Sequence, residues 1–456
     1  MKFSRRAQLA AVVMLAFVLR AIWLARVGSD WALGADSHLY LALAQGLRAG
    51  CGFAPYIERC GTPEVMRTPG YPVLLVPFLG HLRMAIAVQA ALGAWVCFIV
   101  ARFAERRAGP VAGILAAAIV AVDVPTILNS KELITEALFQ AVLTPAIFGS
   151  IEGNPFVAGA ALGIAAIIRP VAVVLVPVVA MPYVAKRSWR GAGVVVSAAL
   201  LIIAAWMVRN DRVAGEFTLT VEGPMNLYLY TAPAVIARHD RVPLETVQLS
   251  YARDAAALIP ARPSPRDGEF EQLYGSDSIV AALENDPALS NFMLSRSLAV
   301  ILAHPIDFAI ITLEGFTRLA IEPYALQTGW QGLITNSRAL AAIQFAAAAF
   351  QFVMLAAIWI GVFRALWNRP RDWEQWILLG AAVLLLLTPS IYAEGISMRY
   401  RSPAIPFLAV LAGIGWLRAT SVGICSKSDS ESAGGGGVNA MDPGFGKVSG
   451  ENRVIS

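Results

Sequence analysis

The chain has 456 residues, of which 57% are hydrophobic and only 15% are charged, and its mean hydropathy is +0.62. Soluble domains carry about 25% charged residues, so this composition predicts a protein of the lipid bilayer and argues against an ordinary soluble enzyme. The net charge is +5, but the basic residues form short clusters beside apolar runs. Clusters of this kind are typical signals for the orientation of membrane helices. The sequence lacks the basic stripe with interleaved aromatic residues that is typical of nucleic-acid binding.

Ten apolar runs are long enough to cross a bilayer as helices. They lie at 7–27, 84–103, 110–124, 132–150, 154–168, 171–185, 191–208, 338–363, 373–392 and 403–418. The first resembles a signal peptide but contains Arg20 and lacks a small-residue cleavage site, so we expect a retained signal-anchor helix. The sequence therefore predicts an all-α polytopic membrane protein with about ten transmembrane helices.

Basic residues flank alternate spans, and with ten spans all of these clusters fall on one side of the membrane. The clusters are Lys2, Arg5 and Arg6; Arg102, Arg106 and Arg107; Lys186, Arg187 and Arg190; and Arg364, Arg369 and Arg371. The positive-inside rule then places both termini in the cytoplasm. Residues 297–321 are apolar as well, but a span there would move the last cluster outside. We therefore expect 297–321 to form an amphipathic helix at the outer interface.

This topology divides the chain into four regions. Residues 1–208 form an N-terminal transmembrane module whose long outer loop, 28–83, carries the candidate chemistry, and 209–337 form an outer segment that includes the interfacial helix. Short helices are expected there at 244–259 and 276–297. Residues 338–420 form the last transmembrane helices, and 421–456, rich in Gly and Ser, are expected to be a disordered cytoplasmic tail.

The four cysteines do not form a disulfide framework. Cys51 and Cys60 share the loop 28–83 and can pair if that loop faces an oxidising space, but two free thiols are an equally good interpretation. Cys97 lies in an apolar run and is expected to be a small core residue.

Ionisable residues gather at helix ends on the predicted outer side. They are Asp36, His38, Arg67, Glu132, Glu136, Arg169, Arg209, Arg399 and Arg401. Charge near a bilayer is costly, so such residues are candidates for function. Arginine forks suit phosphate, and a carboxylate beside them suits a general base. The set predicts transfer of a group from a phosphate leaving group at a membrane surface.

Each of these residues also has a purely structural interpretation. Asp36 can cap the helix that follows it, and Arg169 and Arg209 can be anchors that extend toward the interface. Glu136 can pair with Lys131. His38 can be an ordinary polar residue, and the four histidines show no metal-ligand spacing.

Six short segments, taken in order, resemble the GT-C membrane glycosyltransferases, in particular the branch of the protein O-mannosyltransferases and the lipid A aminoarabinose transferase. The segments are ADSHLYLALAQGLRAGCGF, RTPGYP, TEALF, IIRP, WMVRN with EGPMNLYLY, and RYRSPAIPF. The resemblance implies a GT-C-like helical bundle with periplasmic loops and interfacial helices in the bacterial inner membrane. It also implies an inverting transferase with a polyprenyl-phosphate-linked sugar as donor and a glycan, lipid or protein as acceptor.

The resemblance also implies roles for individual residues. Asp36 matches the presumed catalytic base and Glu136 a second acid of the site. Arg67, Tyr71, Asn226, Arg399 and Arg401 match positions that bind substrate, and the last two are candidates for the lipid phosphate. With His38, Arg169 and Arg209 from the outer-side group, they make up the predicted substrate-binding set. His38 stands where a second acid is often found, which weakens a paired-carboxylate or metal-centred mechanism. No cofactor is firmly expected, and a divalent metal is left open.

Two other functions compete with the enzyme. A multispan transporter or lipid flippase predicts ionisable residues near the middle of the membrane and broken helices in two related halves. The charges lie instead at helix ends, and the halves show no clear match, which favours the enzyme. A scaffold for assembly would tolerate changes at Asp36 and Arg399.

Overall fold

The computed structural model describes residues 4–25, 34–55, 60, 63–257, 287–323, 337–392 and 397–428, and every regular element within them is helical. Among these described residues, five helices are long and apolar enough to cross a membrane, or six if a bent pair of helices at 289–321 counts as one span. The five are α1 (Arg5–Ala21) with its continuation η1 (Ile22–Ala25), α4 (Leu82–Ala108), α10 (Trp189–Ala214), α18 (Ser337–Asn368) and α19 (Trp373–Ser390). The predicted all-α polytopic membrane protein is confirmed.

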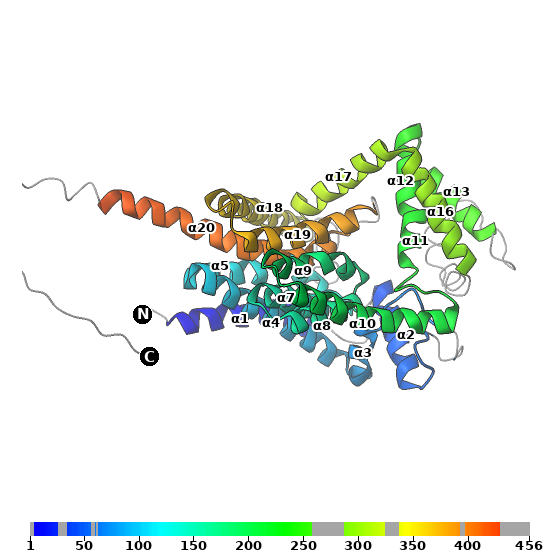
Figure 1. Ribbon diagram of the computed structural model, residues 1–456, viewed down its shortest axis with the longest axis horizontal. Helices are drawn as coiled ribbons and strands as arrows, with labels where there is room; N and C mark the ends of the chain where they lie inside the picture. The colour runs from blue at the N-terminus through cyan, green and yellow to red at the C-terminus, as the bar shows by residue number, and fades with distance from the viewer. Residues whose placement is uncertain are drawn as a thin grey trace, which may run out of the picture.

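Other apolar elements complete the bundle (Figure 1). They are α5 (Pro110–Ala121), α7 (Glu136–Glu152), α8 (Pro155–Ala166), η4 (Pro170–Leu175), α9 (Val176–Ala185) and α20 (Ile405–Ser428). All ten predicted runs therefore contain helix, although the helices at 110–121 and 155–166 have 12 residues each. That is shorter than the roughly 20 residues that a straight crossing needs.

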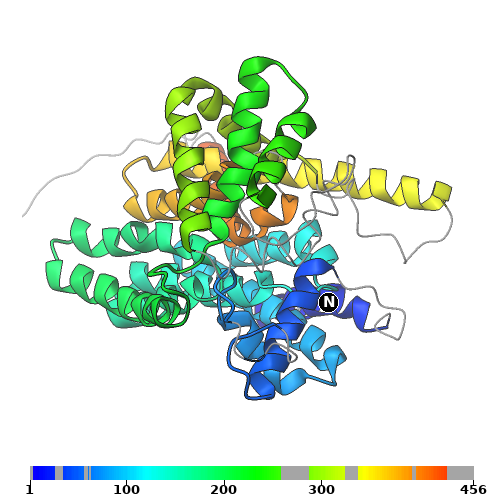
Figure 2. The same cartoon turned by 90° about the vertical axis from the view of Figure 1, so that its right-hand side faces the viewer.

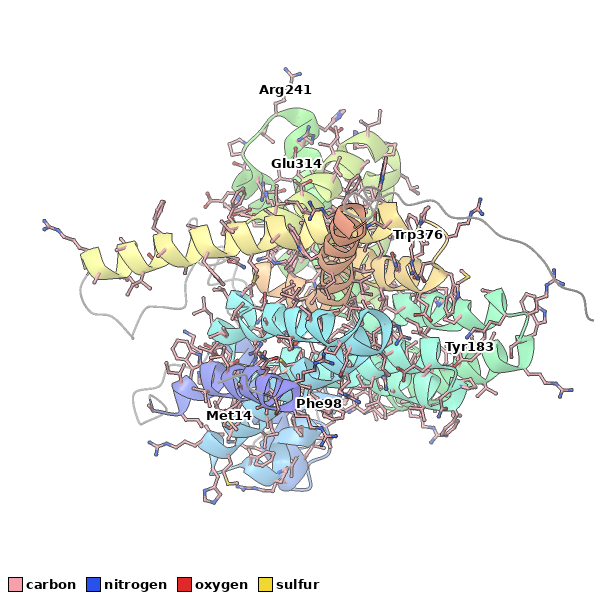
Figure 3. All side chains as sticks on the ribbon, turned by 90° about the vertical axis from the view of Figure 1, so that its left-hand side faces the viewer. Met14, Phe98, Tyr183, Arg241, Glu314 and Trp376 are labelled. Carbon is pink, nitrogen blue, oxygen red and sulfur yellow. A yellow bond between two sulfur atoms is a disulfide. The ribbon has the colours of Figure 1, made fainter. Side chains whose placement is uncertain are left out.

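The helix α20 is the centre of the bundle, which explains its apolar composition on every side. Every residue from 401 to 415 is buried. A Cβ atom on Gly415 would lie 1.9 Å from the carbonyl oxygen of Gly361 on α18. Only glycine permits this approach of two helix backbones. At the surface of the bundle, large side chains such as Met14 (α1), Phe98 (α4) and Trp376 (α19) are exposed, as expected for a face in lipid (Figure 3).

Basic clusters meet at one end of the bundle. Arg107 at the end of α4 forms an ion pair with Glu374 at the start of α19, with 2.7 Å between Nε and Oε2. Arg106 lies 2.5 Å from Glu152 at the end of α7, and the Lys186 ammonium lies 5.0 Å from the centre of the Trp373 ring. The basic clusters at 102–107 and 186–190 therefore share the end of the bundle at which α19 begins, directly after the cluster at 364–371.

The opposite end carries the short elements, at the right of Figure 1 and facing the viewer in Figure 2. They are α2 (Ala35–Arg48), α3 (Gly70–Leu75), η3 (Val76–Phe78), α6 (Val124–Asn129), α11 (Glu222–Asn226), η5 (Leu227–Thr231), α12 (Ala232–Asp240), α13 (Leu244–Ala257), α16 (Pro287–Ala303), α17 (Pro305–Ile321) and η8 (Met398–Ala404). The helix predicted at 244–259 corresponds to α13. The end of the helix predicted at 276–297 lies in α16, and residues 276–286 are outside the described residues.

The single interfacial helix predicted at 297–321 is wrong. The chain forms two helices there, α16 and α17, with a bend of 101° between them at His304. Pro305 is the cause, because proline forces the residue before it out of the helical conformation, and His304 has φ −128° and ψ 58°.

The structure also bears on the predictions for the cysteines and for the C-terminal tail. Cys51 and Cys60 form a disulfide, which decides between the two interpretations of these thiols. Cys97 is a buried core residue, as predicted, and its Sγ donates to the carbonyl oxygen of Ala117 at 3.3 Å. The helix α20 continues to Ser428, beyond the predicted end at 420, and the remainder of the predicted disordered tail lies outside the described residues.

Candidate active site

The start of α2 is attached to the segment that precedes α7. Glu132 Oε2 accepts hydrogen bonds from the backbone N–H of Gly34 (2.8 Å) and from Ser37 Oγ (2.9 Å), and Ser37 Oγ accepts from the N–H of Leu133 at 3.0 Å. The cap residue of α2 is Gly34, so the interpretation of Asp36 as a helix cap is wrong. Asp36 is the second residue of the helix, where the helix dipole still favours its negative charge.

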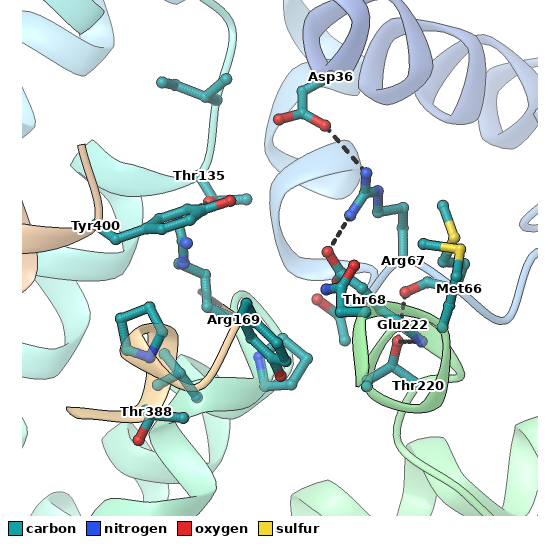
Figure 4. Close-up of a pocket in the computed structure, with 18 of the residues that line it drawn as sticks. Asp36, Met66, Arg67, Thr68, Thr135, Arg169, Thr220, Glu222, Thr388 and Tyr400 are labelled. Atoms are coloured by element: carbon teal, nitrogen blue, oxygen red, sulfur yellow. Dashed lines mark hydrogen bonds and ion pairs between the residues drawn. The ribbon is translucent and has the colours of Figure 1, made fainter. Parts of the chain in front are cut away.

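Asp36 binds two arginines from distant parts of the chain. Its Oδ1 lies 3.0 Å from Arg67 Nη2 and its Oδ2 lies 2.6 Å from Arg399 Nη2. Arg67 also pairs with Glu222 of α11, with 2.7 Å between Nη1 and Oε1. Figure 4 shows Arg67 between the two carboxylates. The loop 28–83, the outer segment 209–337 and η8 thus meet at one carboxylate–guanidinium cluster.

Glu136 continues this cluster on the other side of Arg399. Its Oε1 lies 2.7 Å from Arg169 Nη1 and 3.5 Å from Arg399 Nε. The proposed pairing of Glu136 with Lys131 is wrong, because the Lys131 ammonium lies over the Trp23 ring at 5.9 Å. Three acids and three arginines therefore alternate, in the order Glu222, Arg67, Asp36, Arg399, Glu136 and Arg169.

A cavity of about 630 Å³ opens beside the cluster, and all six of these residues line it. Apolar side chains from η4, η5 and α19 also line the cavity, among them Val171, Val174, Leu229, Leu385 and Pro389. Tyr400, another lining residue, packs against Arg169, whose guanidinium carbon lies 5.3 Å from the ring centre (Figure 4). The cavity combines a strongly charged face with an apolar one at the end of a membrane bundle.

The cluster keeps Asp36 ionised. Burial by itself would raise the pKa of Asp36, but the charges of Arg67, Arg399 and Arg169 and the hydrogen bond from Arg399 outweigh burial. The pKa of this carboxyl falls from 3.8 to about 2. Asp36 is therefore a carboxylate at neutral pH, and its charge is balanced by arginines and not by a proton.

Asn226 is in the cavity wall, as predicted, but His38 and Tyr71 are not. His38 is exposed on α2, because a residue two positions from Asp36 lies on the opposite side of a helix. Tyr40, four positions from Asp36, shares its face and lines the cavity. Tyr71 is fully buried behind Tyr40, with 5.1 Å between ring centres, and its hydroxyl donates to Gln89 Oε1 at 2.7 Å. Tyr71 supports the wall and does not contact the cavity.

Arg209, predicted to bind substrate, is not among the residues that line the cavity. Its Nη1 donates to the carbonyl oxygen of Glu64 at 2.6 Å and its Nη2 to that of Phe53 at 3.2 Å. The guanidinium lies 4.8 Å from the Trp206 ring. Arg209 therefore ties the loop 28–83 to α10.

Arg401 is structural as well, contrary to its predicted contact with the lipid phosphate. It is 1% exposed, and its Nη1 donates to the carbonyl oxygens of Leu319 (3.0 Å) and Glu322 (2.9 Å) at the end of α17. These hydrogen bonds fix η8 against the end of α17.

Sequence reasoning missed Glu222, Tyr40 and Tyr400 as residues of the site. All three lie inside segments that carry the family resemblance, next to residues that were singled out: Glu222 in EGPMN, Tyr40 in ADSHLY and Tyr400 in RYRSP. For Tyr40 the helical spacing from Asp36 was a usable signal. For Glu222 nothing local indicates that it meets Arg67, 155 residues earlier in the chain.

The carboxylates of the cavity do not fit a divalent cation. Asp36, Glu136 and Glu222 each face a guanidinium at 2.6–2.7 Å, and metal binding would have to displace these arginines. Within the described residues, three potential ligand side chains come close enough to share an ion at a different place, between α12 and α17.

Comparisons with known proteins find distant structural likenesses. No protein-family model and no curated protein matches the chain. The archaeal oligosaccharyltransferase AglB from Archaeoglobus fulgidus, solved with an inhibitory peptide and a dolichol-phosphate, has a TM-score of 0.48 and 10% identity over 95% of this chain and 52% of its own. ArnT from Cupriavidus metallidurans bound to undecaprenyl phosphate has a TM-score of 0.36 and 15% identity over 93% of this chain and 80% of its own.

The chain thus spans about half the length of AglB. Both neighbours are GT-C membrane glycosyltransferases, the group that the sequence segments resemble. The roles of residues in this chain therefore rest on its own contacts.

Proposed function

We propose that this chain is an inverting glycosyltransferase that moves a sugar from a polyprenyl-phosphate donor to an acceptor hydroxyl on the periplasmic face of a bacterial inner membrane. One observation carries the proposal. Arg67, Arg169 and Arg399 converge on a cavity of about 630 Å³ that also has an apolar wall, at one end of a membrane bundle. Such a cavity suits a ligand with an anionic head and a hydrocarbon tail.

The arginines would hold the donor phosphate. Guanidinium groups bind phosphate oxygens through paired hydrogen bonds and keep their charge when they are partly buried. The three arginines are balanced by three carboxylates, so an incoming phosphate competes with Asp36, Glu136 and Glu222 for the same N–H groups. A phosphate that takes Arg399 frees one oxygen of Asp36 for the acceptor.

The chemical step is a direct displacement at the anomeric carbon. The acceptor oxygen forms a bond to that carbon while its proton passes to the Asp36 carboxylate. The bond between the anomeric carbon and the phosphate oxygen breaks on the opposite face, and its electron pair leaves with the polyprenyl phosphate. The configuration is thereby inverted. A carboxylate with a pKa of about 2 is a weak base, so proton transfer follows the acidification of the hydroxyl as the new bond forms.

Stabilisation of the leaving group therefore matters as much as the base. Negative charge develops on the phosphate as the bond breaks, and arginines already in place interact with it without further reorganisation. Arg399 touches both Asp36 and Glu136, so it is the residue best placed to couple donor binding to the release of the base.

Two features support the periplasmic side. The basic clusters meet at the other end of the bundle, which the positive-inside rule assigns to the cytoplasm. The Cys51–Cys60 disulfide lies in the loop that carries Asp36, and structural disulfides belong to oxidising spaces such as the periplasm.

The low pKa of Asp36 gives a testable pH dependence. Because the folded-state pKa (about 2) is below the ordinary value of 3.8, the ion pairs of Asp36 contribute fully above pH 3.8 and are lost only as the pH falls toward 2. We expect kcat/KM, which reports the free enzyme, to show no acidic limb from Asp36 between about pH 5 and 8. An acidic limb in that range that disappears in Asp36→Asn would contradict the arrangement of the cluster.

Donor binding can be tested by comparing Arg169 with Arg209, because the sequence predicts both arginines to bind substrate. We expect Arg169→Gln to weaken binding of undecaprenyl phosphate to the purified protein by about 10- to 100-fold, since a charged hydrogen bond contributes roughly 1.5–3 kcal/mol. Arg209→Gln is the matched control, because Arg209 donates to backbone carbonyls outside the cavity. Tryptophan fluorescence or native mass spectrometry measures both. Equal losses in the two variants would remove the evidence for a phosphate site at Arg169.

A further inference from the structure

A second polar cluster lies at the bend between α16 and α17, on the side that faces α12. His239 Nδ1 is 3.1 Å from Asp307 Oδ2, and the ring centres of His239 and His304 are 4.0 Å apart. One potential ligand atom from each of the three residues lies within 4.8 Å of the other two. Figure 1 shows α12, α16 and α17 meeting at the upper right of the molecule, and Figure 3 labels Arg241, which follows α12, and Glu314 on α17.

We propose that His239, His304 and Asp307 form a binding site for one divalent transition-metal ion, with Zn²⁺ as the best match. Two imidazoles and one carboxylate are a ligand set that zinc uses, with a water molecule as the fourth ligand. Zinc–nitrogen bonds of about 2.0–2.1 Å place ligand atoms roughly 3.3 Å apart in a tetrahedral site. The side chain of His239 is 49% exposed, so it can rotate to close the remaining gap.

The surroundings of Asp307 fit an outer shell of such a site. Arg238 Nε lies 3.6 Å from Asp307 Oδ1, which leaves Oδ2 facing the imidazoles, and Arg238 Nη1 donates to Glu314 Oε1 at 3.0 Å. Partners of this kind orient a metal-ligating carboxylate. Arg238, Asp307 and Glu314 together carry one negative charge, so the positive guanidinium does not by itself oppose a divalent ion.

The three ligands come from elements that already pack together. Below the cluster, Ala234 and Val235 of α12 form an apolar contact with Ile311 of α17. His304 is the residue at the bend, and Asp307 is one turn into α17. An ion shared by these side chains would fix α12 against the bend. Because α12 continues directly from α11 and η5, which contribute Glu222, Asn226 and Tyr230 to the cavity, the ion would also steady that wall of the cavity.

Metal titration of the full-length, tag-free protein in detergent tests the proposal. The protein is stripped with a chelator and titrated with Zn²⁺ alone, and Co²⁺ provides an absorption spectrum that reports tetrahedral nitrogen and oxygen ligands. We expect one equivalent to bind to the wild type. We expect His239→Asn, His304→Gln and Asp307→Asn each to weaken binding by more than the roughly 10- to 100-fold that loss of an outer-shell partner costs.

The chain supplies matched controls, because its two other histidines lie elsewhere. His38 is exposed on α2 and His81 precedes α4. The variants His38→Asn and His81→Asn should therefore bind one equivalent of Zn²⁺, as the wild type does. Zinc should also slow amide hydrogen exchange around residues 300–310 in the wild type and leave it unchanged in His239→Asn. Absence of stoichiometric binding to the wild type, or wild-type affinity in His239→Asn, would overturn the proposal. His239 is half-exposed, so its variant is expected to fold even if His304→Gln does not.

Discussion

Asp36→Asn is expected to reduce the rate of sugar transfer by about 10²- to 10⁴-fold, the usual contribution of a positioned general base. Asparagine keeps the shape of the side chain but cannot accept the proton of the acceptor hydroxyl. The variant also removes the carboxylate that competes with the donor phosphate for Arg67 and Arg399. We therefore expect kcat to fall while the affinity for the lipid phosphate is unchanged or higher. Transfer kinetics together with binding of undecaprenyl phosphate measure the two effects separately.

Asp211→Asn is the control for this experiment. Asp211 is an exposed carboxylate near the end of α10, outside the cavity, so its replacement should leave kcat and binding unaltered. Near-normal transfer by a well-folded Asp36→Asn protein would show that Asp36 is not the base. A simultaneous loss of affinity and rate would indicate that Asp36 holds the site together and has no separate role in proton transfer.

Arg399→Gln is expected to lower kcat/KM by about 10²- to 10³-fold, as the loss of one group that stabilises developing charge does in other enzymes. Arg399 contacts Asp36 and Glu136 at the cavity, and its guanidinium is the natural partner of the departing phosphate. Both kcat and donor affinity should fall, since the arginine would act in the bound complex and in the transition state. Arg399→Lys should recover part of the loss, because it restores the charge without the fork.

Arg401→Gln provides a sharp comparison two residues away. It removes buried hydrogen bonds to the carbonyl oxygens of Leu319 and Glu322, so it should lower the temperature of unfolding. In the fraction that remains folded, donor affinity should stay close to that of the wild type. If Arg401→Gln impaired donor binding more than Arg399→Gln at equal stability, the assignment of these two arginines would have to be exchanged.

The contrast between these arginines shows where sequence reasoning ends. Both stand at the predicted outer end of the last helix, and both are equally suited to phosphate. Their segment, η8, is a 3-10 helix, in which residues two apart point to different sides. Neither composition nor apolar periodicity determines which side faces the cavity. Arg209 fails for the same reason, because the contacts that decide its role lie in the irregular part of the loop 28–83.

Other parts of the structure were accessible from the sequence. The ten apolar runs predicted the helices of the bundle, because a helix in lipid requires a long apolar segment and such a segment can be recognised from composition alone. The grouping of Asp36, Glu136 and the arginines at one end followed from topology alone. Two features that were not predicted had a recognisable local pattern in the sequence. The spacing of four between Asp36 and Tyr40 on a predicted helix places both residues on one face, and Pro305 inside the predicted interfacial helix indicates a break. The partner of Arg67 in α11 had no such pattern, since pairing across 155 residues depends on the fold.

The central claim is that this chain transfers a sugar from a lipid phosphate, and one measurement tests it most directly. Membranes containing the wild type, Asp36→Asn or Arg399→Gln are incubated with a panel of polyprenyl-phosphate sugars, and every component that gains a hexose or pentose is identified by mass spectrometry. We predict a glycosylated acceptor and an equal amount of free polyprenyl phosphate with the wild type, and neither product above background with the two variants. Ion-coupled flux of a solute into vesicles without any glycosylated product, or product formation that is the same in all three membranes, would contradict the account.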